Sequence, residues 1–263
     1  MRIIELTMPL YEGMGYSSVY PQEQPFTVEE VYTWDVDGHQ REAYTLSSEP
    51  GTRFILPSIY VEQRDGPKLD EIDLSKFIMR DMAVVDIPKR AEEPILPEEL
   101  DKAIAKAEIQ PGDAILIRTG WGDNESYLKL GEDFELKSPY YGPGFVTHLI
   151  EVLEQYQTDL HCYDVANMHH YSDVKATWCA QKPRPRSWTS LEAKAYVQME
   201  HETRRYAVRS DRRRTSLFAA GITCIGGLTN CGAISRPRVK LIALPLRIKG
   251  RTVAACHAVA IEP

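Results

Sequence analysis

The stretch "EPGTRFILPSI", Glu49–Ile59, is the part of this sequence on which the fold assignment depends most. It combines a Gly-Thr pair, a short apolar run and a proline that closes the run. Its positions raise a chemical question, because charged and apolar side chains share the motif at Glu49, Arg53, Ile55 and Ile59. A glutamate and an arginine placed so close together indicate either a functional site or a structural ion pair.

The composition is that of an ordinary soluble globular protein. The chain of 263 residues is 43% hydrophobic and 26% charged, which is enough for one sizeable core. No apolar run approaches the about 18 residues of a membrane span, and the first residues lack a signal-peptide region, so we expect a cytoplasmic protein. A net charge of −7 argues against general nucleic-acid binding. The five cysteines form no CxxC pair, which favours reduced thiols over a zinc knuckle.

Strand-like apolar segments alternate along the chain with a few amphipathic helical segments. Helices are expected over 96–109, where Leu100, Ile104 and Ala107 share one face, and over 145–157, opening after Pro143 and Gly144. An Asp-Gly pair at 37–38 predicts a hairpin turn between two early strands. Further strands are expected within 2–6, 81–88, 114–118, 160–165, 222–226, 239–248 and 252–262. This order predicts an α/β fold with a mixed β-sheet in a single domain, 1–263.

The segment 172–214 differs from the rest because it is polar and rich in arginine. A nucleic-acid arm is one interpretation, yet aromatic residues are few there and the whole chain is acidic. The composition favours a helical insertion that serves as a lid or as a subunit contact. A lid would exclude water and strengthen the electrostatic interactions beneath it.

Several sequence blocks follow one another in the order of a known family. They are "EPGTRFILPSI", "GDAILIRTGW" at 112–121, "GPGF" at 142–145, "HCYDV" at 161–165, and "SLFAAGITCIGGLTN" followed by "LIALPLRIKG". Together they resemble the cyclase family, which includes bacterial kynurenine formamidases and isatin hydrolases. The resemblance implies a swivelling β/β/α domain that assembles as a homodimer or homotetramer, with an N-terminal loop that reaches a neighbour's site. It also implies a zinc or manganese ion that activates water.

The family's metal-site residues are replaced in this chain. In the family these positions are two ligand histidines, a ligand aspartate, a proton-shuttling histidine, and a later ligand histidine and glutamate. This sequence has, in the same order, Glu49, Arg53, Ile55, Ile59, Arg214 and Gly226. Only Glu49 can donate to a metal, and guanidinium groups repel cations. The sequence therefore predicts no metal and no other cofactor at this place.

The replacements suggest a different chemistry. If the fold is kept, Glu49, Arg53 and Arg214 converge, and the two guanidinium groups can bind a carboxylate or a developing enolate. Glu49 beside apolar Ile55 and Ile59 is a candidate general acid or base. We therefore predict a metal-independent lyase or isomerase acting on a small carboxylated or carbonyl substrate.

Other interpretations of the same residues stay open. The arginines and Glu49 can form a salt-bridge plug in a catalytically silent binding or partner subunit. Hydrolysis of an amide or lactone is the family's own reaction. A relocated metal site could use His169 or His170 with Asp164, although adjacent histidines on an extended segment point opposite ways.

The remaining candidates stand near the expected site. His169 is a candidate replacement for the proton-shuttling histidine, and an exposed or structural pair with its neighbour is the plainer interpretation. Tyr163 and Asp164 end a buried strand, where Asp164 can equally cap a turn. Trp121 can form an apolar wall or simple core. Tyr20 belongs to an N-terminal region that lines the pocket in relatives, and aromatic residues there are more often packing. The expected partner is a small anionic molecule.

Overall fold

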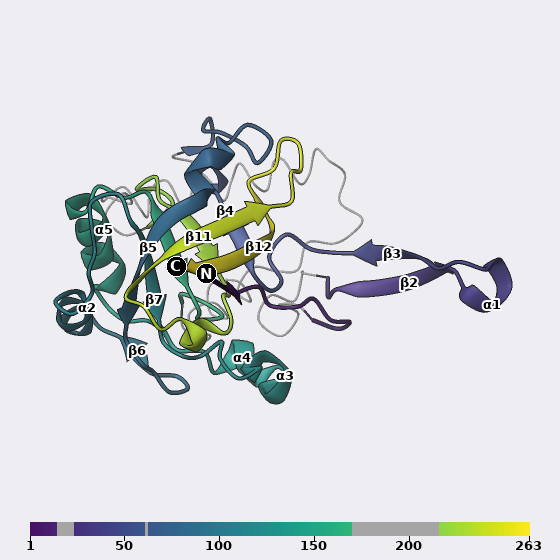
Figure 1. Cartoon of the computed structure of the whole chain (residues 1–263), viewed down its shortest axis with the longest axis horizontal. Coiled ribbons are helices and arrows are strands. Elements are labelled where there is room, and N and C mark those ends of the chain that lie inside the picture. The colour runs from purple at the N-terminus through teal and green to yellow at the C-terminus, as the bar shows by residue number, and fades with distance from the viewer. Residues whose placement is uncertain (15–23, 61–62, 170–215) are drawn as a thin grey trace, which may run out of the picture.

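The computed structural model describes residues 1–14, 24–60, 63–169 and 216–263. Its centre is an eight-stranded sheet with the order β1-β12-β11-β5-β7-β9-β10-β4, in which β12 also pairs with β4. This second pairing closes seven of the strands into a barrel-like arrangement, and β1 is added at its edge (Figure 1). The strands are β1 Arg2–Glu5, β4 Arg53–Ile55, β5 Ile78–Asp86, β7 Ala114–Arg118, β9 Leu160–Tyr163, β10 Thr223–Gly226, β11 Arg238–Pro245 and β12 Val253–Glu262. The predicted mixed α/β fold is confirmed.

Two crossover helices connect three of the parallel strands of the sheet. Strands β5, β7, β9 and β10 run parallel, whereas β4, β11 and β12 pair antiparallel with their neighbours. Helix α2, Pro97–Ile104, connects β5 to β7, and helix α5, Phe145–Gln155, connects β7 to β9. Both helices were expected from the 3.6-residue period of their apolar residues, and both are present with shorter bounds than predicted.

Strand alternation divides the core into two layers. In β7, Leu116 belongs to the apolar cluster inside the barrel, and Ile117 belongs to the cluster beneath the helices. Leu100 of α2 is completely buried in the outer cluster, and Ile104 and Ala107 pack against it, as the sequence predicted. Each strand of the parallel sheet is thus buried on both faces, which explains its nearly continuous apolar sequence.

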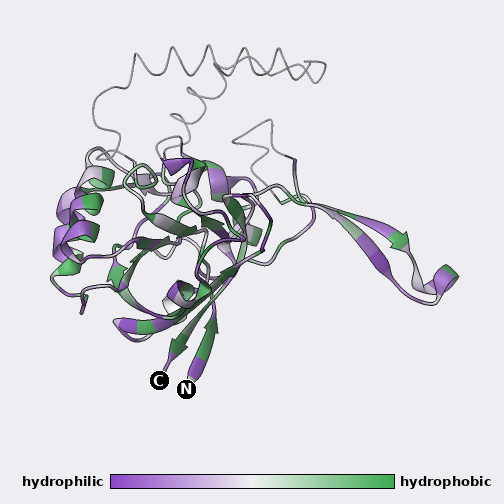
Figure 2. Ribbon diagram, turned by 90° about the horizontal axis from the view of Figure 1, so that it is seen from above, coloured by the Kyte–Doolittle hydropathy of each residue, from purple (hydrophilic) through white to green (hydrophobic). Residues whose placement is uncertain are grey.

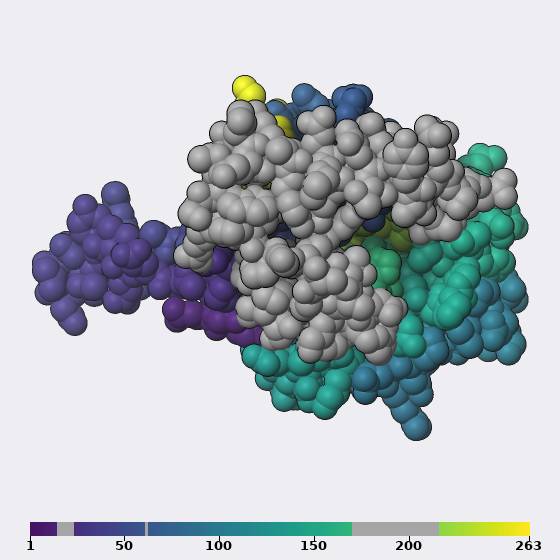
Figure 3. Space-filling view, turned by 180° about the vertical axis from the view of Figure 1, so that it is seen from behind, coloured from purple at the N-terminus to yellow at the C-terminus, as the bar shows by residue number. Residues whose placement is uncertain are grey.

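The predicted hairpin forms an arm that extends from the body (Figures 1 and 2). Strands β2, Thr27–Tyr32, and β3, Arg41–Thr45, pair antiparallel, and between them the chain forms one helical turn, α1, Trp34–Asp37. This turn differs from the predicted strand, which continued to Asp37. The reason is local: the Asp37 carboxylate accepts from the Thr33 amide, and Gly38 ends the turn with φ 69°. Seen from the opposite side, the tip of the arm stands clear of the body (Figure 3).

Shorter elements complete the described structure. They are β6 Pro94–Ile95, β8 Tyr140–Tyr141, α3 Ser126–Leu130 and α4 Asp133–Leu136, and the 3₁₀ turns Pro57–Ile59, Leu74–Phe77 and Cys231–Ala233. Among the described residues, no helix combines the length and the apolarity that a membrane crossing requires. The Arg-rich segment 172–214, together with Arg214, His170 and Tyr20, lies outside the described residues.

Candidate functional site

The barrel brings two of the replaced family positions together. Arg53 begins β4, where it is paired with Gly226 of β10 on one side and with Ala255 of β12 on the other. Alternation along β4 turns Phe54 into the barrel and leaves Arg53 and Ile55 on the outer face. Tyr163, at the end of β9, belongs to the same outer layer. A site assembled from distant segments therefore lies on this face of the sheet.

Arg53 is held tightly in this position. Its side chain is buried, and the residue is only 4% exposed. Nη2 donates to the Ala166 carbonyl at 2.7 Å and Nη1 donates to the Gly51 carbonyl at 3.2 Å. The guanidinium carbon lies 5.9 Å from the centre of the Tyr163 ring, within the range of a cation–π contact. These contacts fix the orientation of a positive charge in a region of low dielectric constant.

Tyr163 and Gly226 form a reciprocal pair. A Cβ atom on Gly226 would lie 2.1 Å from Cζ and 2.2 Å from Oη of Tyr163, so the phenol excludes any side chain at position 226. Tyr163 is 1% exposed, and burial raises the pKa of its phenol, with Arg53 opposing and Glu49 adding to the increase. The phenol therefore keeps its proton at neutral pH, and it fills the space that a longer residue at position 226 would need.

Glu49, Ile55 and Ile59, the other described positions of the motif, differ in how deeply they are buried. Glu49 is half-buried and lies close enough to Tyr163 for its charge to act on the phenol. Ile55 is buried in the outer layer of the core, as is Tyr163, whereas Ile59 is 39% exposed on the 3₁₀ turn that follows. The described part of the site thus contains a guanidinium, a phenol and a carboxylate beside apolar surface.

A buried histidine supports Tyr163 from below. The rings of His161 and Tyr163 stack with centroids 5.5 Å apart. His161 Nδ1 lies 3.1 Å from the Ile115 carbonyl, and Nε2 lies 2.6 Å from the Tyr141 hydroxyl. Because a carbonyl only accepts, Nδ1 carries the proton and Tyr141 donates to Nε2. Burial lowers the pKa of His161 to about 4, so the ring is neutral. His161 and Tyr141 could not be recognised from the sequence as a pair, since their contact depends on tertiary structure.

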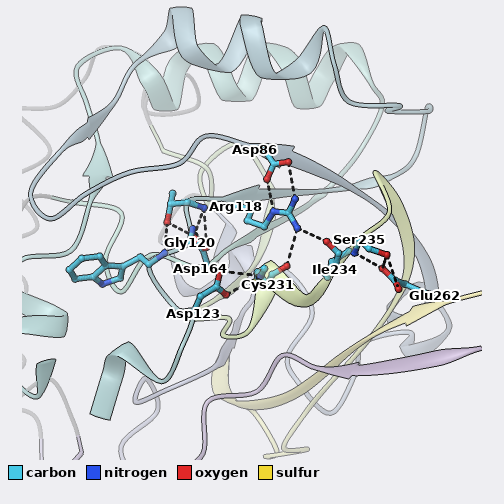
Figure 4. Close-up of polar contacts among 12 residues, drawn as sticks. Asp86, Arg118, Gly120, Asp123, Asp164, Cys231, Ile234, Ser235 and Glu262 are labelled. Carbon is cyan, nitrogen blue, oxygen red and sulfur yellow. Dashed lines mark hydrogen bonds and ion pairs between the residues drawn. The ribbon is translucent and has the colours of Figure 1, made fainter. Parts of the chain in front are cut away.

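Asp164 joins β9 to the loop that follows β7. It is completely buried and accepts hydrogen bonds from the Thr119 amide at 2.9 Å, the Thr119 hydroxyl at 2.6 Å and the Gly120 amide at 2.8 Å (Figure 4). Burial raises its pKa to about 6, although these donors oppose the increase. Both carboxylate oxygens are thus engaged with the loop.

Two other predicted residues are placed as follows. Trp121 donates its indole N–H to the Phe134 carbonyl at 3.0 Å and stacks on the ring of Phe134 at 5.8 Å. His169 is exposed at the end of the described segment.

The residues of this site do not fit the family's metal. Within the described ranges no group of three or more His, Cys, Asp and Glu side chains could hold a metal ion. Where a ligand would project from position 226, the ring of Tyr163 fills the space, and Arg53 adds a positive charge beside it. The positive charge of the guanidinium repels a cation and attracts an anion.

Comparisons with known proteins agree with this architecture. The family described as "Putative cyclase" matches residues 4–169. Isatin hydrolase A from Labrenzia aggregata, bound to benzyl benzoate, is similar with a TM-score of 0.68 and 20% identity, over 98% of this chain and 93% of that chain. Isatin hydrolase A from Ralstonia solanacearum gives 0.67 and 17%, over 98% and 91%. A "predicted metal-dependent hydrolase" from Bacillus stearothermophilus gives 0.60 and 19%, over 98% and 97%. No curated protein matches.

Proposed function

Because this chain belongs to the cyclase family, we propose that it is an enzyme of that family that works without a metal at the family's site. We assign it as a lyase or isomerase of a small carboxylated or carbonyl substrate. The observation that carries the proposal is the buried guanidinium of Arg53 at a ligand position, 5.9 Å from the Tyr163 ring and near Glu49. Membership also supports the swivelling β/β/α class for the barrel and its helices.

Arg53 supplies the positive end of the proposed site. A fixed guanidinium in a poorly solvated position stabilises negative charge that develops on a substrate oxygen, and it needs no reorganisation to do so. Its bonds to the Gly51 and Ala166 carbonyls provide this rigidity. Arg214, which aligns with another family ligand, is proposed as a second anion-binding group. The phenol of Tyr163 keeps its proton and acts as a neutral hydrogen-bonding group beside Arg53.

Glu49 is proposed as the group that moves the proton. Its carboxylate takes a proton from the carbon next to the substrate carbonyl, and the electron pair of that C–H bond moves onto the carbonyl oxygen near Arg53. Return of the proton to another carbon completes an isomerisation. Alternatively, the enolate electrons re-form the carbonyl and make a double bond to the neighbouring carbon, whose hydroxyl group leaves as water with the proton that Glu49 took, which completes a dehydration. Each route needs only a base and an anion-stabilising group, the roles proposed here for Glu49 and Arg53.

The test combines ligand screening with a conservative substitution. Purified protein is analysed for metal, and small carboxylic acids are screened by thermal shift with and without chelator. Acids that stabilise the protein are then tested for turnover. Glu49→Gln keeps the shape of the side chain and removes the base, so we expect turnover to fall by at least about 100-fold while binding persists. The matched control, Glu98→Gln on the exposed face of α2, should retain full activity.

Two results would replace the proposal. About one zinc or manganese per chain, with activity lost on chelation, would favour an amide or lactone hydrolase, the alternative that the fold shared with isatin hydrolases supports. Acid-dependent stabilisation without turnover would favour a silent binding subunit. In that case the main-chain bonds of Arg53 would belong to a structural plug.

The exposed arm supports a homo-oligomer as part of the same proposal. A two-stranded hairpin is marginally stable by itself in water, and this one carries apolar side chains at its tip. Trp34 is 66% exposed and Val36 is 84% exposed. Such a surface fits contact with another copy of the chain. Light scattering of the Trp34→Ser/Val36→Ser variant should then show a smaller assembly than the wild type, whereas an unchanged mass would exclude the arm as the contact.

A further inference from the structure

A cavity lies apart from the site described above. It has a volume of about 690 Å³ and lies between helix α2 and the segment that leads into β11. Its walls include apolar residues from both sides, among them Ile87, Ala103 and Pro237. Glu49, Arg53 and Tyr163 do not contribute to its lining. The volume falls in the range of small-molecule sites, about 300–1,000 Å³.

Two of the lining residues, Asp86 and Arg118, belong to a polar network. Arg118, the last residue of β7, bonds through Nε and Nη2 to the carboxylate of Asp86, the Nη2 bond being 2.8 Å long. Its Nη1 donates to the carbonyls of Cys231 at 3.0 Å and Ile234 at 2.8 Å (Figure 4). The Asp86 carboxylate raises the pKa of Arg118. The charges of Asp86 and Arg118 offset each other, so this pair adds no net charge to the lining of the cavity.

The other acidic residue of the lining is also paired. Glu99 accepts from Lys89 Nζ at 2.6 Å and from the Leu96 amide at 2.9 Å. With both carboxylates paired, the charge balance of the cavity is set by the remaining lining residues Lys102, Lys106 and Arg236. In the part of the chain that the structure describes, these three exposed cations form no ion pair with a carboxylate.

The three cations line two opposite sides of the cavity. Lys102 lies in the last turn of α2 and Lys106 follows two residues after the helix ends, so two like charges line the same wall of the cavity. The negative end of the helix dipole accounts for lysines at this place. It does not account for Arg236, which lies across the cavity on the segment leading into β11. An anion between the two walls would relieve the repulsion and be bound by both.

We infer that this cavity binds a small organic anion that carries at least two negative charges on an apolar body. The charged groups of the ligand are bound by Lys102, Lys106 and Arg236, and its body lies against the apolar walls. Because the cations are exposed, affinity decreases as ionic strength rises. The inference does not depend on the reaction proposed for the other site, and it holds for a silent subunit as well.

The experiment uses isothermal titration of the full chain with four probes. ADP and phthalate carry phosphate or carboxylate charge on a ring system, inorganic phosphate carries charge alone, and adenosine carries a ring system alone. We expect saturable binding of ADP, phthalate or both at low ionic strength, weaker binding of phosphate and none of adenosine. Whichever of ADP and phthalate binds more tightly identifies the charged group that the site prefers.

Two double variants locate the binding. In Lys106→Glu/Arg236→Glu, attraction becomes repulsion, and the affinity should fall by at least about tenfold. Lys249→Glu/Arg251→Glu makes the same change in net charge at exposed residues on the turn between β11 and β12 and should bind as the wild type does. Glu49→Gln should also bind normally, which separates this cavity from the proposed active site. Absence of binding by both ADP and phthalate, or equal binding by both double variants, would overturn the inference.

Discussion

Arg53 and Arg118 are two arginines of one barrel that are held in different ways. Arg118 is paired with the carboxylate of Asp86 and two carbonyls, and its side chain is 19% exposed. Arg53 is buried against the ring of Tyr163, and it too donates to two carbonyls. A guanidinium in this barrel can thus belong to the framework or to a proposed site. An exposed carboxylate partner favours the first role, whereas burial against an aromatic ring at a former ligand position favours the second.

The largest expected effect comes from removing each guanidinium in turn. Arg53→Met would leave the buried carbonyls of Gly51 and Ala166 without their donor, and we expect it to lower the free energy of unfolding by about 4 kcal/mol. Arg118→Met leaves the carbonyls of Cys231 and Ile234 without their donor, but water reaches this position more easily. We expect it to lower the free energy of unfolding by about 2 kcal/mol. Urea unfolding of both variants measures the difference. Equal losses would show that the two arginines are structurally equivalent.

The pH dependence of stability tests the surroundings of Arg53, because His161 stacks on the Tyr163 ring that Arg53 contacts. The folded-state pKa of His161 is lowered from 6.5 to about 4, so its contribution to stability is complete above pH 6.5 and is lost as the pH falls toward 4. This contribution amounts to about 3 kcal/mol. Asp164 acts in the opposite direction, because its pKa is raised to about 6 and its protonation at lower pH favours the folded state.

The histidine contribution is obtained from a difference between proteins. The free energy of unfolding is measured from pH 7 to pH 4 for the wild type and for His161→Gln, and one curve is subtracted from the other. The carboxylate effect is common to both proteins and cancels. A difference that shrinks by about 3 kcal/mol toward pH 4 is expected. A difference independent of pH would mean that the imidazole beneath Tyr163 is not held neutral.

The Tyr163–Gly226 pair gives the next effect. Gly226→Ala places a Cβ atom 2.1 Å from Cζ of Tyr163, and overpacking of this kind should cost about 2 kcal/mol. Tyr163→Val removes the ring, so the alanine should cost much less in the double variant. The loss of unfolding free energy in the double variant should be smaller than the sum of the two single losses by about 1–2 kcal/mol. Simple additivity would contradict the reciprocal packing.

The smallest effect concerns the surface pair. The Asp86 side chain is 56% exposed, so Asp86→Asn should lower the free energy of unfolding by less than about 1 kcal/mol. Added salt should reduce the loss further, because the exposed partner is screened. Urea unfolding at low and high ionic strength checks both statements. A loss as large as that of Arg53→Met would contradict the contrast between the two arginines.

The order of strands and helices could be read from the sequence because it depends on local periodicity. The alternation of Ala114–Arg118 and the apolar face of α2 both predict the elements that are present. The turn at Trp34–Asp37 was not predicted as helical, since a single carboxylate bond decides it. The charged replacements in Glu49–Ile59 could also be recognised, because they interrupt a motif whose spacing is kept.

The sequence by itself determined that the chain is a mixed α/β protein of the cyclase family and that the ligand positions carry other side chains. Only the tertiary structure decided that Tyr163 occupies the space next to Gly226 and that His161 stacks on it while bonded to Tyr141. The same holds for the place of Arg118 in the lining of a basic cavity. The physical reason is that periodicity and motifs report interactions between near neighbours in the chain. These partnerships join strands that meet only when the barrel closes.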